Sequence, residues 1–234
     1  MNRVAIVTGA NRGIGKALAL GLAADGFNVA TMARNVNDLK PVAREAGLDE
    51  SRFLPIALDL SDTSSIINAV RNIPPEFGRI EVLVNNAGMG VVGTLDVKFD
   101  TLESLLAVNL TGPFLLLQQV VPIMLKGRSG TIINVASRAG KVGFAGCGAY
   151  GASKFGLVGL SESLYRELAP HGIKVTALCP SWVDTDMARE SGTPLSSKEM
   201  IQPDDLMKTV RWLISLSPAA CIKEVVVECA KDLG

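Results

Sequence analysis

The sequence predicts an α/β fold: a doubly wound parallel sheet with helices on both faces. Two observations support this. Seven short apolar runs alternate with helical segments along the chain, and the first run ends in a glycine-rich turn. With 234 residues, 48% of them hydrophobic, the chain is long enough for one well-filled core. Because it contains no linker and no low-complexity tract, we expect one domain over residues 1–234.

Runs rich in β-branched residues predict strands at 4–8, 27–33, 52–58, 80–84, 131–137, 173–179 and 224–228. The segments between them predict helices from the glycine turn to Asp25 and at 36–46, 64–73, 99–126, 148–169 and 204–216. Residues 184–203 lack strong periodicity and contain Gly192 and Pro194, so we expect a substrate lid there.

The composition argues against several kinds of partner. Lys and Arg total 23 and Asp and Glu also total 23, so the chain offers no basic field for nucleic acid. The first apolar run is too short for a membrane span and lacks the layout of a signal peptide. The four cysteines form no C-x-x-C pair and are expected to be reduced thiols. We therefore expect a cytoplasmic protein that binds no nucleic acid, membrane or metal.

The turn T-G-A-N-R-G-I-G, from Thr8 to Gly15, lies between the first strand and the first helix. Gly9, Gly13 and Gly15 let the backbone turn sharply and approach a pyrophosphate at the helix N-terminus. The spacing differs from the commonest dinucleotide fingerprint, G-x-G-x-x-G, so an ordinary tight turn is the alternative.

The end of the second strand indicates which nucleotide binds. An acidic residue at this place binds the ribose 2′-hydroxyl of NAD. This chain has Ala33–Arg34–Asn35 instead, with no carboxylate before Asp38. Arg34 and Arg12 place two guanidinium groups where a 2′-phosphate would lie, which favours NADP over NAD. The alternative is that both arginines are solvated surface charges.

The segment from Asn134 to Lys154 carries the groups best suited to chemistry. Ser137 stands where the fifth strand ends, and parallel strands present residues to ligands at that end. Tyr150 and Lys154 are four residues apart and share one helix face. We expect the ammonium to move the pKa of Tyr150 from about 10 towards neutrality, so that the phenol exchanges a proton with a substrate oxygen. Considered alone, this pair also fits a chance spacing in a helix.

Three other features belong to this pattern. The string N-N-A-G, Asn85–Gly88, follows the fourth strand and would let a flat cofactor ring lie close. Asn109 lies in an apolar helix, where a buried amide needs hydrogen-bond partners, and Gly112–Pro113 predicts a bend that frees backbone groups for it. His171, the only histidine, is expected in a surface turn.

Together with Asp59 after the third strand, these motifs resemble the short-chain dehydrogenase/reductase family in its NADP-preferring subgroup. They occur in the family's order and approximate spacing over nearly the whole chain. The resemblance implies a Rossmann-type sheet of seven strands in the order 3-2-1-4-5-6-7, with NADP(H) lying across the carboxyl ends of the strands.

The resemblance also implies roles for individual residues. Tyr150 would be the acid/base, Lys154 would lower its pKa and hold the nicotinamide ribose, and Ser137 would position the carbonyl. Asn109 would stabilise the bent helix and anchor a water in the proton path. The cofactor-binding residues implied in this way are Gly9, Asn11, Arg12, Gly13, Ile14, Gly15, Arg34, Asn35, Asp59, Leu60, Asn86, Ala87, Gly88, Tyr150, Lys154, Pro180, Val183 and Thr185.

Two features depart from the family pattern. Ser181 follows Pro180 where the family usually has glycine, and its Cβ is expected to stiffen the root of the lid. The C-terminal K-E-V-V-V-E-C-A-K-D-L-G also lacks the T-G-x…D-G-G ending common in fatty-acid-synthesis members. The second departure weakens the case for an acyl-carrier-protein thioester as substrate.

We expect an NADPH-dependent carbonyl reductase, with a 3-oxoacyl-(acyl-carrier-protein) thioester reductase as the alternative. A non-catalytic NADP-binding sensor or scaffold is the alternative from another class. The substrate walls are expected to be apolar and to offer no arginine or lysine to a carboxylate, which ranks a small neutral ketone or aldehyde first. These walls are Met89, Val91, Phe144, Trp182, Met187 and Leu195. A carrier protein would need a basic patch, part of which Lys126, Arg128, Arg138 and Lys141 would supply.

The helices at 99–126 and 148–169 carry apolar residues on more than one stripe: Leu115, Leu116, Leu117, Leu157, Leu160 and Leu164. A helix that is apolar on two faces needs a second partner. Family members commonly pair through these helices, so the resemblance implies a homodimer or homotetramer.

Overall fold

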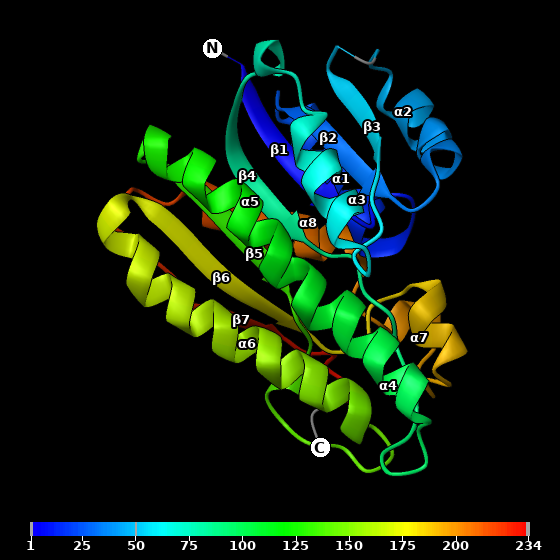
Figure 1. Cartoon of the computed structure of the whole chain (residues 1–234). Helices are drawn as coiled ribbons and strands as arrows, with labels where there is room; N and C mark the ends of the chain where they lie inside the picture. Colours follow the sequence, from blue (N-terminus) through cyan, green and yellow to red (C-terminus); the bar gives the residue numbers. More distant parts are fainter. Residues whose placement is uncertain (1, 50, 233–234) are drawn as a thin grey trace.

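The computed structural model describes residues 2–49 and 51–232, and in them seven parallel strands form one sheet (Figure 1). The strands are β1 (Arg3–Thr8), β2 (Asn28–Ala33), β3 (Phe53–Ala57), β4 (Arg79–Asn85), β5 (Gly130–Val135), β6 (Ile173–Pro180) and β7 (Glu224–Val227). Their order in the sheet, β3-β2-β1-β4-β5-β6-β7, confirms the predicted fold class.

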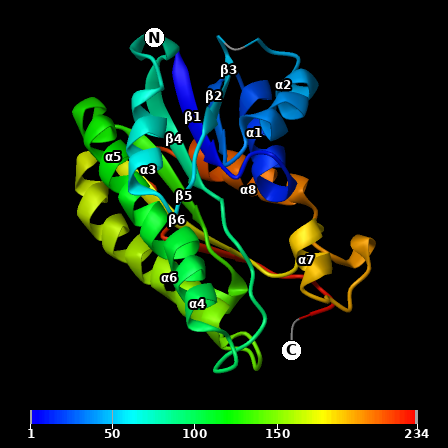
Figure 2. The same ribbon diagram turned by 45° about the vertical axis from the view of Figure 1, so that its right-hand side comes forward.

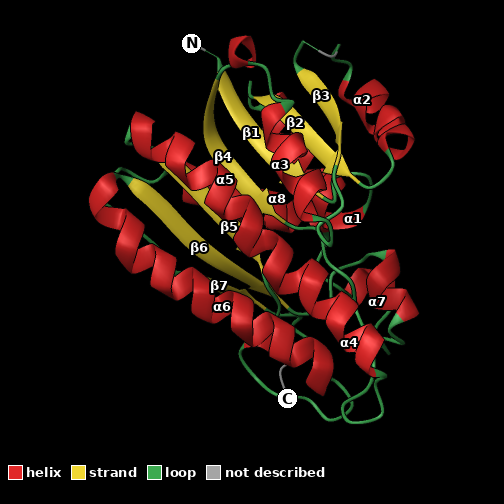
Figure 3. Cartoon of the chain, viewed as in Figure 1, coloured by secondary structure: helices red, strands yellow, loops and turns green. Residues whose placement is uncertain are grey.

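Helices connect the strands, as the alternating pattern predicted (Figure 3). They are α1 (Gly13–Ala24), α2 (Lys40–Ala46), α3 (Thr63–Arg71), α4 (Phe99–Leu106), α5 (Gly112–Gly127), α6 (Gly148–Leu168), α7 (Asp186–Glu190) and α8 (Pro203–Ser215). The helix expected at 36–46 begins as a 3₁₀ turn, Val36–Leu39, and becomes α-helical where Pro41 sits in the first turn.

Two apolar layers cover the sheet. One face packs against α1, α2 and α8, and the other against α3, α5 and α6 (Figures 1 and 2). Every residue of β2 and of β5 is buried. Strands covered on both faces must be apolar at consecutive positions, which is why these segments appear as continuous runs and not as alternating ones.

The connectivity reverses at β1, which pairs with β2 on one side and with β4 on the other. The helices that follow these strands therefore leave to opposite faces, and a crevice opens at the carboxyl ends of β1 and β4. In Figures 1 and 2, α7 and the chain that follows β7 lie at this same end of the sheet.

The helix expected at 99–126 is divided by a π-helical turn, Ala107–Thr111. Pro113 explains this irregularity, because it has no N–H to donate to the carbonyl of Asn109 four residues earlier. Gly112 lets this turn approach the loop after β3: a Cβ on Gly112 would lie 2.5 Å from the carbonyl oxygen of Leu60. The predicted bend thus has a local cause in the sequence.

By length and composition alone, the helical stretch Phe99–Gly127 would suit a membrane span. Its inner face packs against the sheet, where Leu116, Val120 and Met124 are buried. Core helices of globular proteins commonly combine this length with this hydropathy, so the packing accounts for the apolar composition.

Candidate active site

A cavity of about 1520 Å³ extends across the carboxyl ends of the strands. Ser137, Tyr150 and Lys154 line it, as do all of the expected cofactor-binding residues except Gly15. Gly15 lies beneath the glycine turn, and Asn109 lies behind the cavity wall with 1% of its surface exposed. The structure therefore brings residues that are far apart in the sequence to one place.

The glycine turn is shaped by close backbone approaches. Gly9 has a φ of +65°, which favours glycine, and a Cβ on Gly15 would lie 2.2 Å from the Gly9 carbonyl oxygen. The buried hydroxyl of Thr8 accepts hydrogen bonds from the N–H groups of Asn86 (3.0 Å) and Ala87 (2.9 Å). The Asn86 amide donates back to the Thr8 carbonyl at 2.9 Å. These contacts fix the glycine turn to the loop after β4.

The turn leads into the N-terminus of α1, where Arg12 is the capping residue but its side chain accepts no hydrogen bond. The first N–H groups of α1 are therefore free to bind an anion, assisted by the helix dipole. A Cβ on Gly13 would lie 3.1 Å from the side chain of Thr185. Gly13, Ile14 and Thr185 all line the cavity, so a pyrophosphate bound there would lie beside these N–H groups.

Two guanidinium groups lie at the adenosine end of the cavity. Arg34 is exposed at the end of β2, and its charge contributes to lowering the pKa of Asp59. The larger cause of that lowered pKa is the hydrogen bond from the Ser61 hydroxyl, at 2.6 Å. Arg12 lies 3.9 Å from Asp186 across the mouth of the cavity, and both side chains are more than half exposed. An exposed pair of this kind is weak, so Arg12 remains available to a phosphate.

Tyr150 enters the cavity from the first turns of α6, and burial raises the pKa of its phenol to about 12. A hydrogen bond with the Ser137 hydroxyl acts in the opposite direction but is the smaller effect. This result is the reverse of the expectation from the Tyr–Lys spacing, which was a pKa moved towards neutrality. The reason is that desolvation disfavours the phenolate more than its neighbours favour it. The phenol is therefore protonated at pH 7.

The Lys154 ammonium lies 5.7 Å from the centre of the Tyr150 ring and donates to the carbonyl of Val135 at 3.0 Å. Burial lowers the pKa of Lys154 to about 8. The ammonium is thus still charged at pH 7, although it is buried. Its position between the end of β5 and the phenol follows from the helix spacing that the sequence showed.

Asn109 uses its whole amide to hold the loop after β4. Its Oδ1 accepts from the Met89 N–H at 2.9 Å, and its Nδ2 donates to the Met89 carbonyl at 2.9 Å and to the Ser153 hydroxyl at 3.1 Å. A Cβ on Gly88 would lie 3.2 Å from Asn109 Oδ1, so the loop passes close to the amide. The predicted requirement for hydrogen-bond partners is met by this loop and by α6.

The short chain dehydrogenase family model matches residues 3–195. The chain belongs to the short-chain dehydrogenase/reductase family. A crystal structure of a betaketoacyl-[ACP] reductase (FabG) from Bacteroides thetaiotaomicron is 41% identical with a TM-score of 0.88, covering 100% of this chain and 99% of that one. The 3-oxoacyl-[acyl-carrier-protein] reductase FabG of Salmonella typhimurium is 39% identical over 188 residues, 80% of this chain and 76% of that protein.

A metagenomic short-chain oxidoreductase solved in complex with NADP is also similar, with 38% identity and a TM-score of 0.83 over 97% of this chain and 96% of that one. The predicted family and cofactor are thereby confirmed: this short-chain dehydrogenase/reductase is an NADP(H)-dependent oxidoreductase. The free N–H groups of α1 and the exposed guanidinium groups of Arg12 and Arg34 suit that cofactor, because its 2′-phosphate carries negative charge.

Ser181, the first departure from the family pattern, connects β6 to the chain beyond β7. Its hydroxyl accepts from the N–H of Cys229 at 2.8 Å, and its own N–H donates to the Val227 carbonyl at 2.8 Å. The Cys229 thiol donates to the Trp182 carbonyl at 3.0 Å. The backbone N–H and the hydroxyl of Ser181 thus both join these segments, and the hydroxyl contact had no signal in the sequence.

Five of the six expected wall residues line the cavity: Met89, Val91, Phe144, Trp182 and Met187. The sixth, Leu195, instead is partly buried against the hydrophobic core. Arg138 also lines the cavity, which corrects the expectation that this end holds no arginine. The sequence feature that could have indicated this location is the position of Arg138 directly after Ser137.

The expected basic patch does not form. Lys126 and Arg128 lie where α5 ends and β5 is about to begin, at the amino edge of the sheet and thus away from the cavity. Lys141 pairs with Glu224 at 2.7 Å, and Arg138 is occupied by carboxylates of the C-terminal segment. His171 is exposed in a 3₁₀ turn, as predicted.

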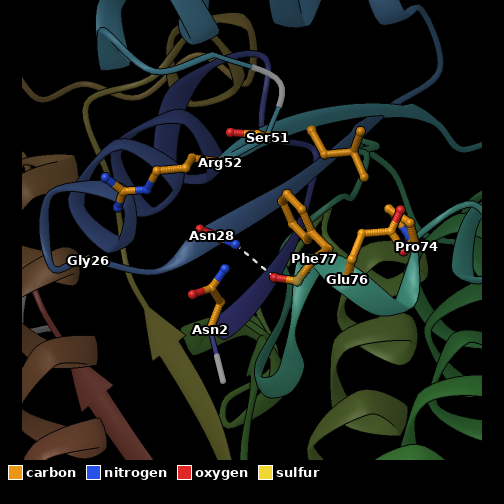
Figure 4. A pocket seen from close by; sticks show the side chains of 9 residues that line it. Asn2, Gly26, Asn28, Ser51, Arg52, Pro74, Glu76 and Phe77 are labelled. Atoms are coloured by element: carbon orange, nitrogen blue, oxygen red, sulfur yellow. Dashed lines mark hydrogen bonds between the residues drawn. The ribbon is translucent and has the colours of Figure 1, made fainter.

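A second hollow of about 530 Å³ lies at the opposite, amino edge of the sheet (Figure 4). It is bordered by Asn2, Asn28, Arg52 and Phe77, and the Asn28 amide already donates to the Phe77 carbonyl at 2.7 Å. None of the predicted site residues borders this hollow.

Because the Lys154 ammonium is buried, we expect it to lower the free energy of unfolding of the protein. Because the pKa of Lys154 falls from 10.5 to about 8 on folding, the unfolded chain binds this proton more tightly. The penalty is fully present below about pH 8 and disappears as the pH rises through 10.5. Lys154→Met is therefore expected to raise the free energy of unfolding by about 1–3 kcal/mol at pH 7 and by much less at pH 10, measured by urea denaturation.

Lys174→Met provides the matched control, because Lys174 is a half-buried lysine that also donates to a backbone carbonyl, that of Leu216, at 2.6 Å. A Lys154→Met protein that is less stable than the wild type at pH 7 would contradict the prediction.

Proposed function

We propose that this short-chain dehydrogenase/reductase is an NADPH-dependent carbonyl reductase acting on a small, neutral ketone or aldehyde. The observation that carries the proposal is the meeting of a protonated phenol, a hydroxyl and an ammonium in one cavity: Tyr150, Ser137 and Lys154. Bound NADPH supplies the hydride that the carbonyl carbon accepts. The remaining requirement is a proton for the carbonyl oxygen.

Each of the three side chains has a separate role in supplying this proton. Ser137 donates a hydrogen bond that orients the carbonyl oxygen towards the phenol. Tyr150 transfers its proton to that oxygen as negative charge develops there, giving an alcohol and a phenolate. The Lys154 ammonium, 5.7 Å from the ring centre, stabilises the phenolate electrostatically and is also within the part of the cavity proposed for the nicotinamide ribose. Asn109 positions this wall through its two hydrogen bonds to the Met89 backbone.

A 3-oxoacyl thioester is the second candidate substrate. The similarity to the FabG proteins named above supports it, because those proteins are 3-oxoacyl-[acyl-carrier-protein] reductases. The four basic residues expected to form a carrier patch do not gather as free charges at the cavity, since Lys126 and Arg128 lie at the other edge of the sheet and Lys141 and Arg138 are paired, which favours the small substrate. A non-catalytic sensor of NADP would need the glycine turn but not the phenol, so the complete set of three groups argues against that class.

We expect Tyr150→Phe to lower turnover by roughly 10²–10⁴, because the change removes only the transferable proton and keeps the ring. NADPH binding, followed by fluorescence titration, should be retained. Tyr165→Phe is the matched control, since Tyr165 is the only other tyrosine and lies on the same helix outside the cavity. Turnover of Tyr150→Phe close to the wild-type value would show that another group supplies the proton.

The substrate class is tested by comparing kcat/KM for a neutral aromatic ketone, a free acetoacetyl thioester and the same thioester on a carrier protein. We expect the aromatic ketone to be the best of the three, because five apolar side chains line the substrate end and the basic residues considered for an acidic carrier do not gather there as free charges. A much higher kcat/KM for the carrier-bound thioester than for the free one would reverse this ranking.

We further propose that residues 1–234 act as one domain in the cytoplasm, with 184–203 as the substrate lid. Met187 of this segment lines the cavity, and Gly192, with a φ of +75°, allows the sharp turn after α7. The exposed contact between Arg12 and Asp186 links the segment to the glycine turn.

A homodimer or homotetramer is proposed from the outer faces of α4, α5 and α6. The leucines expected on these faces are mostly turned inwards: Leu116, Leu117 and Leu157 are buried. Large apolar side chains are nevertheless exposed there, namely Phe99, Phe114, Ile123 and Phe155. We expect a dimer or tetramer by light scattering at micromolar concentration and dissociation in Phe155→Glu. A monomeric wild type would refute the proposal.

A further inference from the structure

The guanidinium of Arg138 lies at the substrate end of the cavity. Ser137 accepts a hydrogen bond from the Ala139 N–H at 3.1 Å and so caps the 3₁₀ turn Arg138–Gly140, which fixes the direction of the next side chain. The Arg138 side chain is only 12% exposed, and its guanidinium carbon lies 4.8 Å from the centre of the Phe144 ring. The arginine, the serine and the phenylalanine border the same cavity as Tyr150.

The segment after β7 brings carboxylates to this guanidinium. Asp232 Oδ2 lies 3.0 Å from Arg138, Glu228 Oε1 lies 3.5 Å away, and Arg138 also donates to the backbone carbonyl of Asp232. The hydrogen bond between Ser181 and Cys229 holds this segment against β6. Asp232 borders the cavity, whereas Glu228 does not. The position of Asp232 is therefore fixed by the fold and by its own backbone, in addition to its charge.

The charge of Arg138 is then compensated by a neighbouring carboxylate. Apart from Lys154, which donates to the Val135 carbonyl, Arg138 is the one cation that borders the substrate end among the described residues. An unpaired arginine there would bind a substrate carboxylate through a charge-assisted hydrogen bond. With Asp232 against it, an incoming carboxylate would meet a like charge beside Arg138, and the guanidinium would not be free to compensate the loss of its hydration.

We propose that Asp232 sets the charge selectivity of the substrate pocket: by occupying Arg138 it reserves the site for neutral carbonyl compounds and excludes keto acids. The inference rests on the proposed carbonyl reduction. One carboxylate of the C-terminal segment, that of Asp232, then determines the selectivity. When residue 232 is neutral, Arg138 becomes able to bind a substrate carboxylate.

The test uses two probes of nearly the same shape, methyl benzoylformate, which is neutral, and benzoylformate, which is anionic. The measured quantity is the ratio of kcat/KM for the acid to that for the ester, with NADPH. Asp232→Asn keeps the backbone contact and the shape but removes the charge, and we expect it to raise the ratio by about 10- to 100-fold. Glu228→Gln is the matched control, because Glu228 touches the same guanidinium but lies outside the cavity, and its ratio should change by less than about 3-fold.

Arg138→Gln added to Asp232→Asn should abolish the gain, because the carboxylate then has no cation to bind. Asp232→Ser provides a second neutral variant, and reduction of the ester reports in each case that the protein is folded. A ratio in Asp232→Asn equal to the wild-type ratio, with ester reduction intact, would overturn the inference. A wild type that reduces neither probe nor any other carbonyl would instead refute the proposed function.

Discussion

The hydrogen bonds from the loop after β4 to Thr8 are the contacts on which the site depends. Thr8 ends β1, and its hydroxyl accepts from the backbone of both Asn86 and Ala87. β1 and β4 are neighbours only because the order of strands reverses there, and the helices after them diverge to opposite faces. Beyond the pairing of β1 with β4, the Thr8 contacts join the glycine turn to the loop that Asn109 holds from behind.

The buried phenol and ammonium show why this arrangement suits reduction. On an exposed helix face, a tyrosine and a lysine four residues apart would both be solvated, and each would keep its ordinary pKa. Here desolvation raises the pKa of Tyr150 to about 12 and lowers that of Lys154 to about 8. The phenol thus holds its proton until a stronger base, the developing alkoxide, is present, and the ammonium is next to the phenolate that results. The low dielectric that makes the charged states costly also strengthens the attraction between them.

Much of the fold was predictable because its signals are local. The apolar runs gave each strand to within two residues, and Pro113 with Asn109 indicated the irregular helix that became a π turn. The glycine turn and the group of Ser137, Tyr150 and Lys154 were recognisable as motifs, and the cavity brings them together. The pKa of Tyr150 was not predictable, because its sign depends on how deeply the tertiary structure buries the phenol. The orientation of the Arg138 side chain was also not predictable from the sequence. It depends on the turn that Ser137 caps and on a C-terminal segment that lies 94 residues later.

The two ends of the cavity differ in how far their arginine side chains are exposed to solvent, and this difference determines which charges each end can bind. At the adenosine end, Arg12 keeps 61% of its side chain exposed, so water compensates its charge and a phosphate can replace that water. At the substrate end, the side chain of Arg138 is 12% exposed, and an unpaired guanidinium at that depth would lose most of its hydration. The fold therefore has to supply a carboxylate there, and Asp232 is held in place to do so. A phosphate-bearing cofactor at one end and an uncharged carbonyl at the other are therefore consistent with how much of each arginine side chain is exposed to water.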